Sequence, residues 1–450
     1  MKKWAELVFI PYPGISHLES TVKIAKLIVD RDDRLFITVL VMKQTSLTDL
    51  NAQTNDVIVS AASERIKFVE LSPYDHSHPG KFKSVLLKTQ KPNVKNVTTE
   101  IVRSGSSRPD SPRLAEFVID MFCTTMIDVA NEFGVPTYVF YTSGAGFLGL
   151  MFHLQELHDE HRVDPTELQN DPDAELVVPC FVERVPTSAL PYAAVAEGWA
   201  SLLIHNTRRM REAEGIIVNS FLELESHAVI SLSNGKFPSL YLVGPILNST
   251  DGGGQILLGD QFSDFITWLD DQPPLSEVFL CFGSMGYFRE DQVKEIACAL
   301  AQRFLDRTAG RGKAIGWTPQ VDVLAHRAIS WFVSHCGWNS VLGSLWFGVP
   351  TATWPVYAEQ YLNAFQLVKE LGIAEEIKLD FKSGFYIESE RTVLGAQEIE
   401  GGTRRLMEDG NEIRKRVKEM SEKSRKAVMG VGSSYSSLDR LICDVVENLP

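Results

Sequence analysis

The fold is decided by residues 329–347, ISWFVSHCGWNSVLGSLWF. They begin with the apolar run Ile329 to Val333, which has the continuous hydrophobicity of a buried parallel strand. Small and amide-bearing residues follow, and a helical run continues from Ser340 to Phe347. A strand that enters a helix through such a turn presents free backbone N–H groups and a positive dipole end, which suit a phosphate. The imidazole of His335 and the indole of Trp338 therefore predict an anion site with aromatic walls.

This turn lies inside a longer pattern of aromatic, amide and acidic residues. The pattern consists of Trp317-Thr318-Pro319-Gln320, Ser334-His335-Cys336-Gly337-Trp338-Asn339-Ser340, Gly348-Val349-Pro350, Trp354-Pro355 and Glu359-Gln360. It resembles the donor-binding box of plant UDP-dependent glycosyltransferases of family 1, and the rest of the chain resembles that family from His17 to the C-terminal helices. The resemblance implies an α/β protein of the GT-B fold, with two facing Rossmann-like doubly wound domains. It also implies an enzyme that glycosylates small acceptors with inversion.

Composition narrows the class of protein. A chain of 450 residues is too long for one ordinary domain. Its net charge of −14 argues against nucleic acid or an anionic membrane as a partner. The six cysteines are scattered without a Cys-x-x-Cys pair, so we expect a reducing, cytoplasmic setting and no metal site. The family resemblance implies no cofactor beyond the UDP-sugar. We find no apolar run of about 18 residues that could span a bilayer, and we expect a monomer.

Apolar runs alternate with helical patterns along the chain, which indicates parallel α/β sheets. The expected strands are 7–10, 36–42, 66–71, 116–120, 137–141, 215–218, 240–243, 278–282, 313–316, 329–333, 351–353 and 374–377. Residues 159–191 have no clear period and predict a long surface excursion. We therefore predict an acceptor-binding domain at 1–244, a linker at 245–262, a UDP-sugar-binding domain at 263–430 and a C-terminal helix at 431–450. The C-terminal helices are expected to cross back to the N-terminal domain.

Two polar residues follow expected strands in the first domain. His17 lies just past the first strand and Asp120 ends the fourth, and ligands of parallel sheets bind outside the carboxyl ends of the strands. Ser16 and Glu19 stand as in a capping box, which would make His17 the first helical residue. The helix dipole disfavours a protonated imidazole there, so His17 could accept a proton from an acceptor hydroxyl. Asp120 would bond to the other ring nitrogen. The family resemblance implies these two roles, a base and the carboxylate that orients it, for this pair.

The resemblance assigns the UDP-sugar to the second domain. Backbone N–H groups of Asn339 and Ser340, with His335 and the hydroxyl of Ser284, would hold the diphosphate. The indole of Trp317 would stack on uracil. The full set of expected donor-binding residues is Thr142, Ser284, Trp317, Thr318, Gln320, His335, Gly337, Trp338, Asn339, Ser340, Trp354, Glu359 and Gln360. Core packing is the alternative role for the tryptophans, and Gln360 favours glucose as the sugar.

The expected reaction is transfer of a sugar to a hydroxyl group of a flavonoid, another phenolic or a triterpenoid. Two other hypotheses stay open beside it. Residues 144–149, GAGFLG, match Gly-x-Gly-x-x-Gly, which would suit an NAD(P)-dependent oxidoreductase. The acidic residue expected about 20 positions later would fall in the irregular stretch instead. Against the family pattern, the chain lacks a strand and a loop between Leu300 and Arg303, and has Gly343 where relatives carry a ribose-binding glutamate. Both departures fall in the donor domain and predict, as the alternative, a catalytically weak or inactive homologue.

Overall fold

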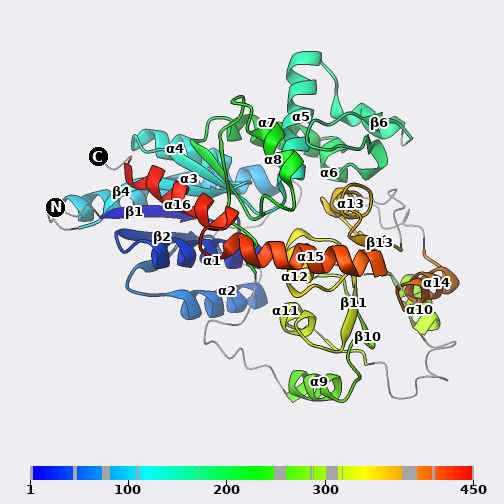
Figure 1. Ribbon diagram of the computed structural model, residues 1–450. Coiled ribbons are helices and arrows are strands. Elements are labelled where there is room, and N and C mark those ends of the chain that lie inside the picture. The colour runs from blue at the N-terminus through cyan, green and yellow to red at the C-terminus, as the bar shows by residue number, and fades with distance from the viewer. Residues whose placement is uncertain are drawn as a thin grey trace. The chain divides into compact units, whose positions relative to one another are not determined.

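The computed structural model describes residues 4–43, 48–72, 82–107, 111–171, 173–247, 260–283, 286, 288–300, 313–316, 318–377, 393–407 and 411–447 (Figure 1). The chain divides into two compact units. Unit 1 consists of Met1–Gln155, Ser201–Ile246 and Lys426–Pro450, and unit 2 of Glu156–Ala200 and Leu247–Arg425. Each unit contains a parallel sheet whose strands are connected through helices, so the predicted pair of Rossmann-like domains is confirmed.

Unit 1 is built on a seven-stranded parallel sheet in the order β3-β2-β1-β4-β5-β8-β9. The strands are β1 (Ala5–Ile10), β2 (Leu35–Val41), β3 (Ile66–Glu70), β4 (Arg113–Asp120), β5 (Thr137–Tyr141), β8 (Gly215–Val218) and β9 (Ser239–Leu242). The helices are α1 (Ile15–Arg31), α2 (Thr48–Ala61), α3 (Phe82–Ser106), α4 (Ile127–Glu132), α5 (Ala145–His161), α7 (Trp199–Met210) and α8 (Ser226–Leu232). The strand order reverses between β1 and β4, where ligands of such sheets bind.

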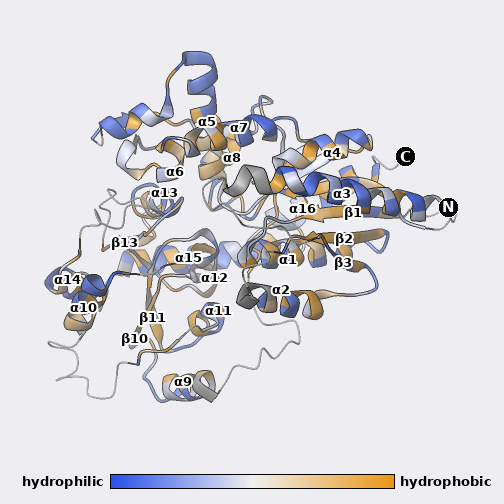
Figure 2. Ribbon diagram, turned by 180° about the vertical axis from the view of Figure 1, so that it is seen from behind, coloured by the Kyte–Doolittle hydropathy of each residue, from blue (hydrophilic) through white to orange (hydrophobic). Residues whose placement is uncertain are grey.

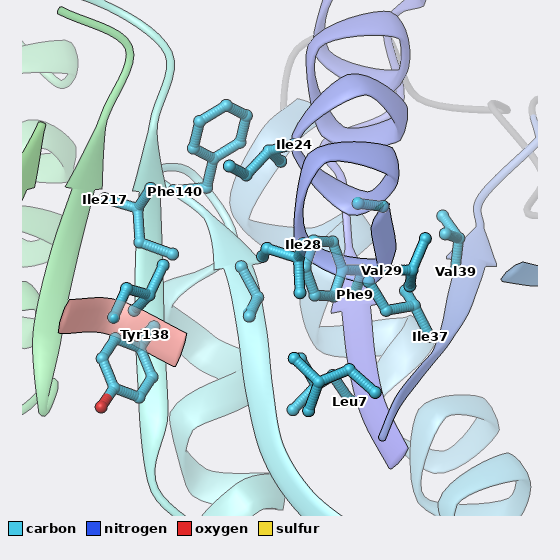
Figure 3. Close-up of a cluster of buried hydrophobic side chains, with 14 of the residues drawn as sticks. Leu7, Phe9, Ile24, Ile28, Val29, Ile37, Val39, Tyr138, Phe140 and Ile217 are labelled. Carbon is cyan, nitrogen blue, oxygen red and sulfur yellow. The ribbon is translucent and has the colours of Figure 1, made fainter. Parts of the chain in front are cut away.

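The core of unit 1 forms where α1 crosses the central strands (Figure 3). Ile24 and Ile28 are one helical turn apart, so both point from α1 toward the sheet. They pack with Leu7 and Phe9 of β1, and all four side chains are at most 2 % exposed. Burying one such side chain contributes about 1.5–3 kcal/mol. In Figure 2 the strand β1 is hydrophobic and the outer helix α3 is largely hydrophilic, as expected of a sheet covered by helices.

The C-terminal helix α16 (Ser433–Glu447) belongs to unit 1. It packs against β9 and adds Leu438, Leu441 and Ile442 to the core around β1 (Figure 1). The hydroxyl of Tyr241 donates a hydrogen bond to the carboxylate of Asp444. The predicted return of the C-terminal helices to the N-terminal domain is therefore confirmed.

Unit 2 has, in its described residues, a four-stranded parallel sheet in the order β10-β11-β12-β13. The strands are β10 (Glu277–Cys281), β11 (Ile329–Ser334), β12 (Thr351–Thr353) and β13 (Ala374–Glu376). The helices include α9 (Asp260–Asp270), α10 (Glu290–Leu300), α11 (Gln320–Leu324), α12 (Trp338–Phe347), α13 (Gln360–Phe365), α14 (Ala396–Met407) and α15 (Asn411–Val428). All of β11 is buried, whereas β10 is mostly half-buried because it forms the edge of the described sheet.

The structure adds to or corrects the expectations for three parts of the chain. Residues 313–316 are not a strand, because no strand of the described sheet lies beyond β10 to pair with them. The expected excursion at 159–191 contains short regular elements, the 3₁₀ helix Pro165–Asn170 and a hairpin of β6 (Glu175–Leu176) and β7 (Val185–Pro186). The helices α2 and α3 were not expected from the sequence, and Pro92 inside α3 obscures its pattern.

Part of the predicted organisation lies outside the described residues. This applies to most of the linker, at 248–259, and to 301–312, next to Leu300, where the family pattern predicts a missing segment. Within the described ranges, no helix has both the length and the apolar character needed to cross a bilayer.

Candidate active site

A histidine and an aspartate meet at the switch point of the unit 1 sheet. The distance from His17 Nδ1 to Asp120 Oδ2 is 2.7 Å, although the residues are 103 positions apart. Asp120 is the last residue of β4 and its side chain is fully buried, whereas the imidazole is 22 % exposed. The backbone N–H of Phe122 donates to the other carboxylate oxygen at 2.9 Å, which fixes the carboxylate. Donation from Nδ1–H to Asp120 leaves Nε2 as the nitrogen that can take a proton.

The position of His17 in its helix differs from the expectation. Gly14 is the N-cap residue, no side chain caps the helix, and His17 is the third helical residue. The predicted capping box between Ser16 and Glu19 is therefore wrong, since both residues already lie inside α1. His17 still lies in the first turn, where the helix dipole acts.

Aromatic rings surround this pair. The rings of Tyr12, His17 and Phe122 contact one another edge-on, with centroids 5.3–5.8 Å apart. Phe122 also borders a small, mostly apolar pocket. The pocket is lined by Met121, Phe122, Tyr141, Phe147, Met151, Leu203, Asn206, Thr207 and Met210. The half-buried Thr142 lies beside it, with its hydroxyl 3.8 Å from the sulfur of Met121. The ring of Phe122 therefore contacts both His17 and the pocket.

In unit 2, the turn between β11 and α12 is strained and firmly held. Cys336 has a φ of 63°, a conformation that is uncommon for a residue other than glycine. The hydroxyl of Ser334 accepts the N–H of Cys336 at 3.0 Å, and the amide of Asn363 donates to its carbonyl oxygen at 2.9 Å. Strain that the surroundings maintain in this way is typical of ligand sites. Sequence reasoning did not assign a role to Ser334 or Asn363; Asn363 follows Gln360 by one helical turn, a spacing that could have drawn attention to it.

His335 is buried in this turn and lies between two glycines. A Cβ atom on Gly283 would lie 2.7 Å from His335 Nε2, and one on Gly337 would lie 2.6 Å from it. Burial lowers the pKa of His335 to about 4, and a hydrogen bond to the backbone of Cys281 only partly opposes this shift. The imidazole is therefore neutral at physiological pH. Its Nδ1 atom has no partner among the described residues.

The N-terminus of α12 is open to a ligand. No side-chain hydrogen bond caps it within the described residues, and its first residues are Trp338, Asn339 and Ser340. Two more buried polar atoms of unit 2, Asn339 Oδ1 and Thr318 Oγ1, also have no partner in the described part of the chain. Each unsatisfied buried group costs about 1–3 kcal/mol, so each of these atoms would gain from a polar ligand.

Gln320 is placed beside this helix end. Its side-chain oxygen accepts the hydroxyl hydrogen of Ser340 at 3.0 Å and lies 3.7 Å from the sulfur of Cys281, at the end of β10. The structure therefore brings two of the expected donor-binding residues together at the ends of two neighbouring strands.

The end of the predicted donor box has mainly structural contacts. The side-chain oxygen of Gln360 accepts the N–H groups of Val356 and Tyr357, each at 2.9 Å, so its Nε2 group alone remains for a sugar. Trp354 is 2 % exposed and packs against Phe282 with ring centroids 5.4 Å apart, which is a core position. Trp338 is also buried, and Glu359 is half-buried immediately before α13.

Two expected donor-binding residues, Ser284 and Trp317, lie outside the described residues. Among the side chains that the structure describes, no three His, Cys, Asp or Glu residues gather as a metal ion would require.

At the Gly-x-Gly-x-x-Gly match, residues 144–149, a side chain of the protein itself takes the place where a dinucleotide would bind. The carboxylate of Glu225 accepts the N–H groups of Ala145 and Gly146 at the start of α5, both at 2.8 Å. Glu225 is 3 % exposed and also accepts the hydroxyl hydrogen of Ser220. An internal carboxylate therefore occupies the helix end where a pyrophosphate would bind, and the oxidoreductase hypothesis is wrong.

Comparison with known proteins identifies the family. Residues 277–383 match the family described as UDP-glucoronosyl and UDP-glucosyl transferase. The chain is 48 % identical to UDP-glucose flavonoid 3-O-glucosyltransferase 6 of Fragaria ananassa, over 98 % of this chain and 99 % of that one. The chain belongs to the plant UDP-glycosyltransferases. It is thus a glycosyltransferase of the GT-B fold.

Solved structures of this family agree with the fold. One solved structure is a transferase from Siraitia grosvenorii in complex with UDP. Its sequence is 40 % identical to this chain, and the two structures align with a TM-score of 0.83 over 98 % of this chain and 99 % of that one. UGT71G1 of Medicago truncatula, complexed with UDP-glucose, is 37 % identical, with a TM-score of 0.87 and 99 % of both chains covered.

This glycosyltransferase is shorter than the relative from Fragaria ananassa. The alignment runs over 485 positions against the 450 residues of this chain, so at least 35 positions have no counterpart here. The difference agrees in kind with the missing segment inferred from the sequence, although the alignment length does not give its place.

Proposed function

We propose that this glycosyltransferase transfers glucose from UDP-glucose to a hydroxyl group of a small phenolic acceptor such as a flavonoid. His17 Nε2 takes the proton of the acceptor hydroxyl as its oxygen attacks the anomeric carbon. The bond between that carbon and the diphosphate breaks, and its electrons leave with UDP. Attack from the face opposite the leaving group inverts the configuration at the anomeric carbon. Asp120 fixes the tautomer of His17 and stabilises the imidazolium that forms.

The observation that carries this proposal is the 2.7 Å contact between His17 Nδ1 and the buried Asp120 carboxylate, beside an apolar pocket. A flavonoid enzyme and a complex with UDP-glucose among the relatives support the choice of acceptor and donor.

The neutral His335 and the open N-terminus of α12 are proposed to bind the diphosphate. Thr318, Gln320, Gly337, Trp338, Asn339 and Ser340 complete the proposed nucleotide site on unit 2, with Ser284 and Trp317 as the family pattern assigns them. Thr142 and Glu359 are proposed to contact the sugar. In this role the unsatisfied Nδ1 of His335 and Oδ1 of Asn339 would gain partners from the ligand.

The experiment is incubation with UDP-glucose and a panel of flavonols, simpler phenolics and triterpenoids. Mass spectrometry should detect an added hexose, and NMR of the product should give the β-anomer expected from inversion of an α-linked donor. A product with the α configuration, or turnover only of substrates without a free hydroxyl group, would contradict the proposed reaction.

Gln360 supports glucose as the transferred sugar and offers a separate test. The Gln360→Glu variant keeps an oxygen for the N–H groups of Val356 and Tyr357 but removes the Nε2 donor. Losing one such hydrogen bond should raise the KM for UDP-glucose about fivefold to tenfold, with little change in melting temperature. Equal turnover of UDP-galactose and UDP-glucose by the wild type would contradict the sugar assignment.

A catalytically weak homologue is the second candidate, favoured by the shorter chain and by Gly343. A Cβ on Gly343 would lie 3.6 Å from the nearest side-chain atom, an ordinary contact, so the helix has room for the start of a side chain. Calorimetric titration with UDP distinguishes the candidates. Weak binding that the Gly343→Glu variant tightens would favour the second candidate, and low-micromolar binding that it leaves unchanged would reject it.

A further inference from the structure

The pocket beside His17 is lined by three polar side chains, those of Tyr141, Asn206 and Thr207, and the proposed reaction uses none of them. Asn206, on α7, lines this mostly apolar pocket and is 5 % exposed. Its side-chain oxygen accepts the hydroxyl hydrogen of the fully buried Thr124 at 3.0 Å. The amide thereby has one end fixed, and no residue in the described ranges accepts a hydrogen bond from its Nδ2 group.

The neighbouring residue on α7 serves as an internal comparison. Thr207 also lines the pocket, but its hydroxyl donates to the backbone oxygen of Leu203 at 2.8 Å. The hydrogen of that hydroxyl is used inside the helix, whereas the Nδ2 hydrogens of Asn206 are not. The two residues share the pocket and the helix, and differ in the donor that they can offer to a ligand.

We propose that Asn206 is a specificity-determining residue that donates a hydrogen bond from Nδ2 to an oxygen of the acceptor, at the end remote from the hydroxyl that is glucosylated. This proposal rests on the proposed function. Phe122 contacts the ring of His17 with centroids 5.8 Å apart and also lines the pocket. The proposal places the reacting hydroxyl of the acceptor at His17 and its far end in the pocket, with the ring of Phe122 between them.

A site that desolvates a donor discriminates strongly against ligands that leave this donor unpaired. The acceptor class is accordingly a phenolic with an oxygen on its distal ring. Kaempferol and galangin are suitable probes, because galangin lacks only the 4′-hydroxyl of the distal ring.

The test measures kcat/KM for both flavonols and, independently of turnover, their Kd by calorimetry. The wild type should prefer kaempferol by about tenfold in both quantities. Asn206→Leu, of similar volume but without the donor, should bring the ratio close to one and leave galangin bound as well as before or better. Thr207→Val is the matched control and should keep the wild-type ratio.

Several outcomes would overturn the inference. One is a wild type that binds both flavonols equally or neither, a result that does not depend on any variant folding. Another is an unchanged ratio in Asn206→Leu, or a ratio lost equally in Thr207→Val, which would indicate packing of α7 instead. If no acceptor is glucosylated while the affinity ratio behaves as expected, the proposed function fails and the role of Asn206 in binding stands.

Discussion

Two histidines, His17 in unit 1 and His335 in unit 2, each follow a parallel strand and have opposite surroundings. His17 is 22 % exposed, and its Nδ1 atom lies 2.7 Å from a buried carboxylate. His335 is buried, has no carboxylate among its described hydrogen-bond partners, and has a pKa lowered to about 4. A partner carboxylate stabilises an imidazolium, whereas burial without one disfavours it. The same side chain after a strand can thus be suited to gaining a proton or to remaining neutral.

The largest effect should follow from removing the histidine that is paired. His17→Ala should lower kcat by about 10²–10⁴-fold, the usual contribution of a general base, with little change in the Kd for UDP-glucose. The chain offers a matched control, because the exposed His158 also contacts an aspartate, Asp159, at 2.7 Å. His158→Ala should retain wild-type kcat. If His17→Ala glucosylated the same hydroxyl at the wild-type rate, His17 and Asp120 would not be the catalytic pair.

The next largest effect should come from filling the space around the buried histidine. Gly283→Ala and Gly337→Ala would each place a methyl group within 2.7 Å of His335 Nε2, so the imidazole must move. Gly283 also has a φ of +78°, which adds backbone strain to that variant. We expect the Kd for UDP-glucose to rise at least about tenfold, as for a lost or misplaced hydrogen bond.

Gly430→Ala is the control for these glycine variants, since a Cβ there meets nothing within 4 Å. Isothermal titration of all three variants with UDP-glucose gives the comparison. Unchanged affinity in both Gly283→Ala and Gly337→Ala would show that the position of His335 does not matter for donor binding.

A smaller effect concerns the dependence of stability on pH. The folded-state pKa of His335 is about 4, below its ordinary value of 6.5, so the unfolded chain binds more protons between these values. Its contribution to stability is present above pH 6.5 and is lost as the pH falls toward 4. Between pH 7 and pH 5 the free energy of unfolding of the wild type should fall by about 2 kcal/mol more than that of His335→Gln. The slope is about 1.4 kcal/mol per pH unit between the two pKa values of His335. Urea unfolding at both pH values measures this difference, and parallel losses in the two proteins would contradict it.

The smallest effect concerns the helices that follow the two histidines. Gly343 lies inside α12, whereas α1 has no internal glycine. Gly343→Ala should stabilise the protein by about 0.5–1 kcal/mol, because alanine reduces the entropy of the unfolded chain and its Cβ makes an ordinary contact. The reverse exchange in α1, Ala25→Gly, should destabilise it by at least as much. A lower melting temperature in Gly343→Ala would indicate that this position of α12 does not tolerate a side chain.

The sequence was sufficient to predict the strand–turn–helix at His335 because its signals are local. A continuous apolar run, small residues at the turn and a helical period specify β11 and α12 within a few positions. The same kind of signal failed for residues 313–316, since a strand also needs a partner and the partner is not part of the segment. It failed again at the start of α1, where Gly14 and not Ser16 became the N-cap.

The amino-acid sequence by itself determined the family, through the resemblance of residues 317–360 to its donor-binding box. It also determined the two α/β units and the residues that follow each strand, because these depend on periodicity and on spacing along the chain. Only the tertiary structure decided which of these residues meet and in what state. It paired His17 with Asp120 across 103 positions, buried His335 and used the oxygen of Gln360 for the backbone. It also placed Glu225 at the glycine-rich helix end and Asn206 in the pocket. The physical reason is that burial and hydrogen bonding depend on neighbours that are remote in the chain, and a local pattern does not contain them.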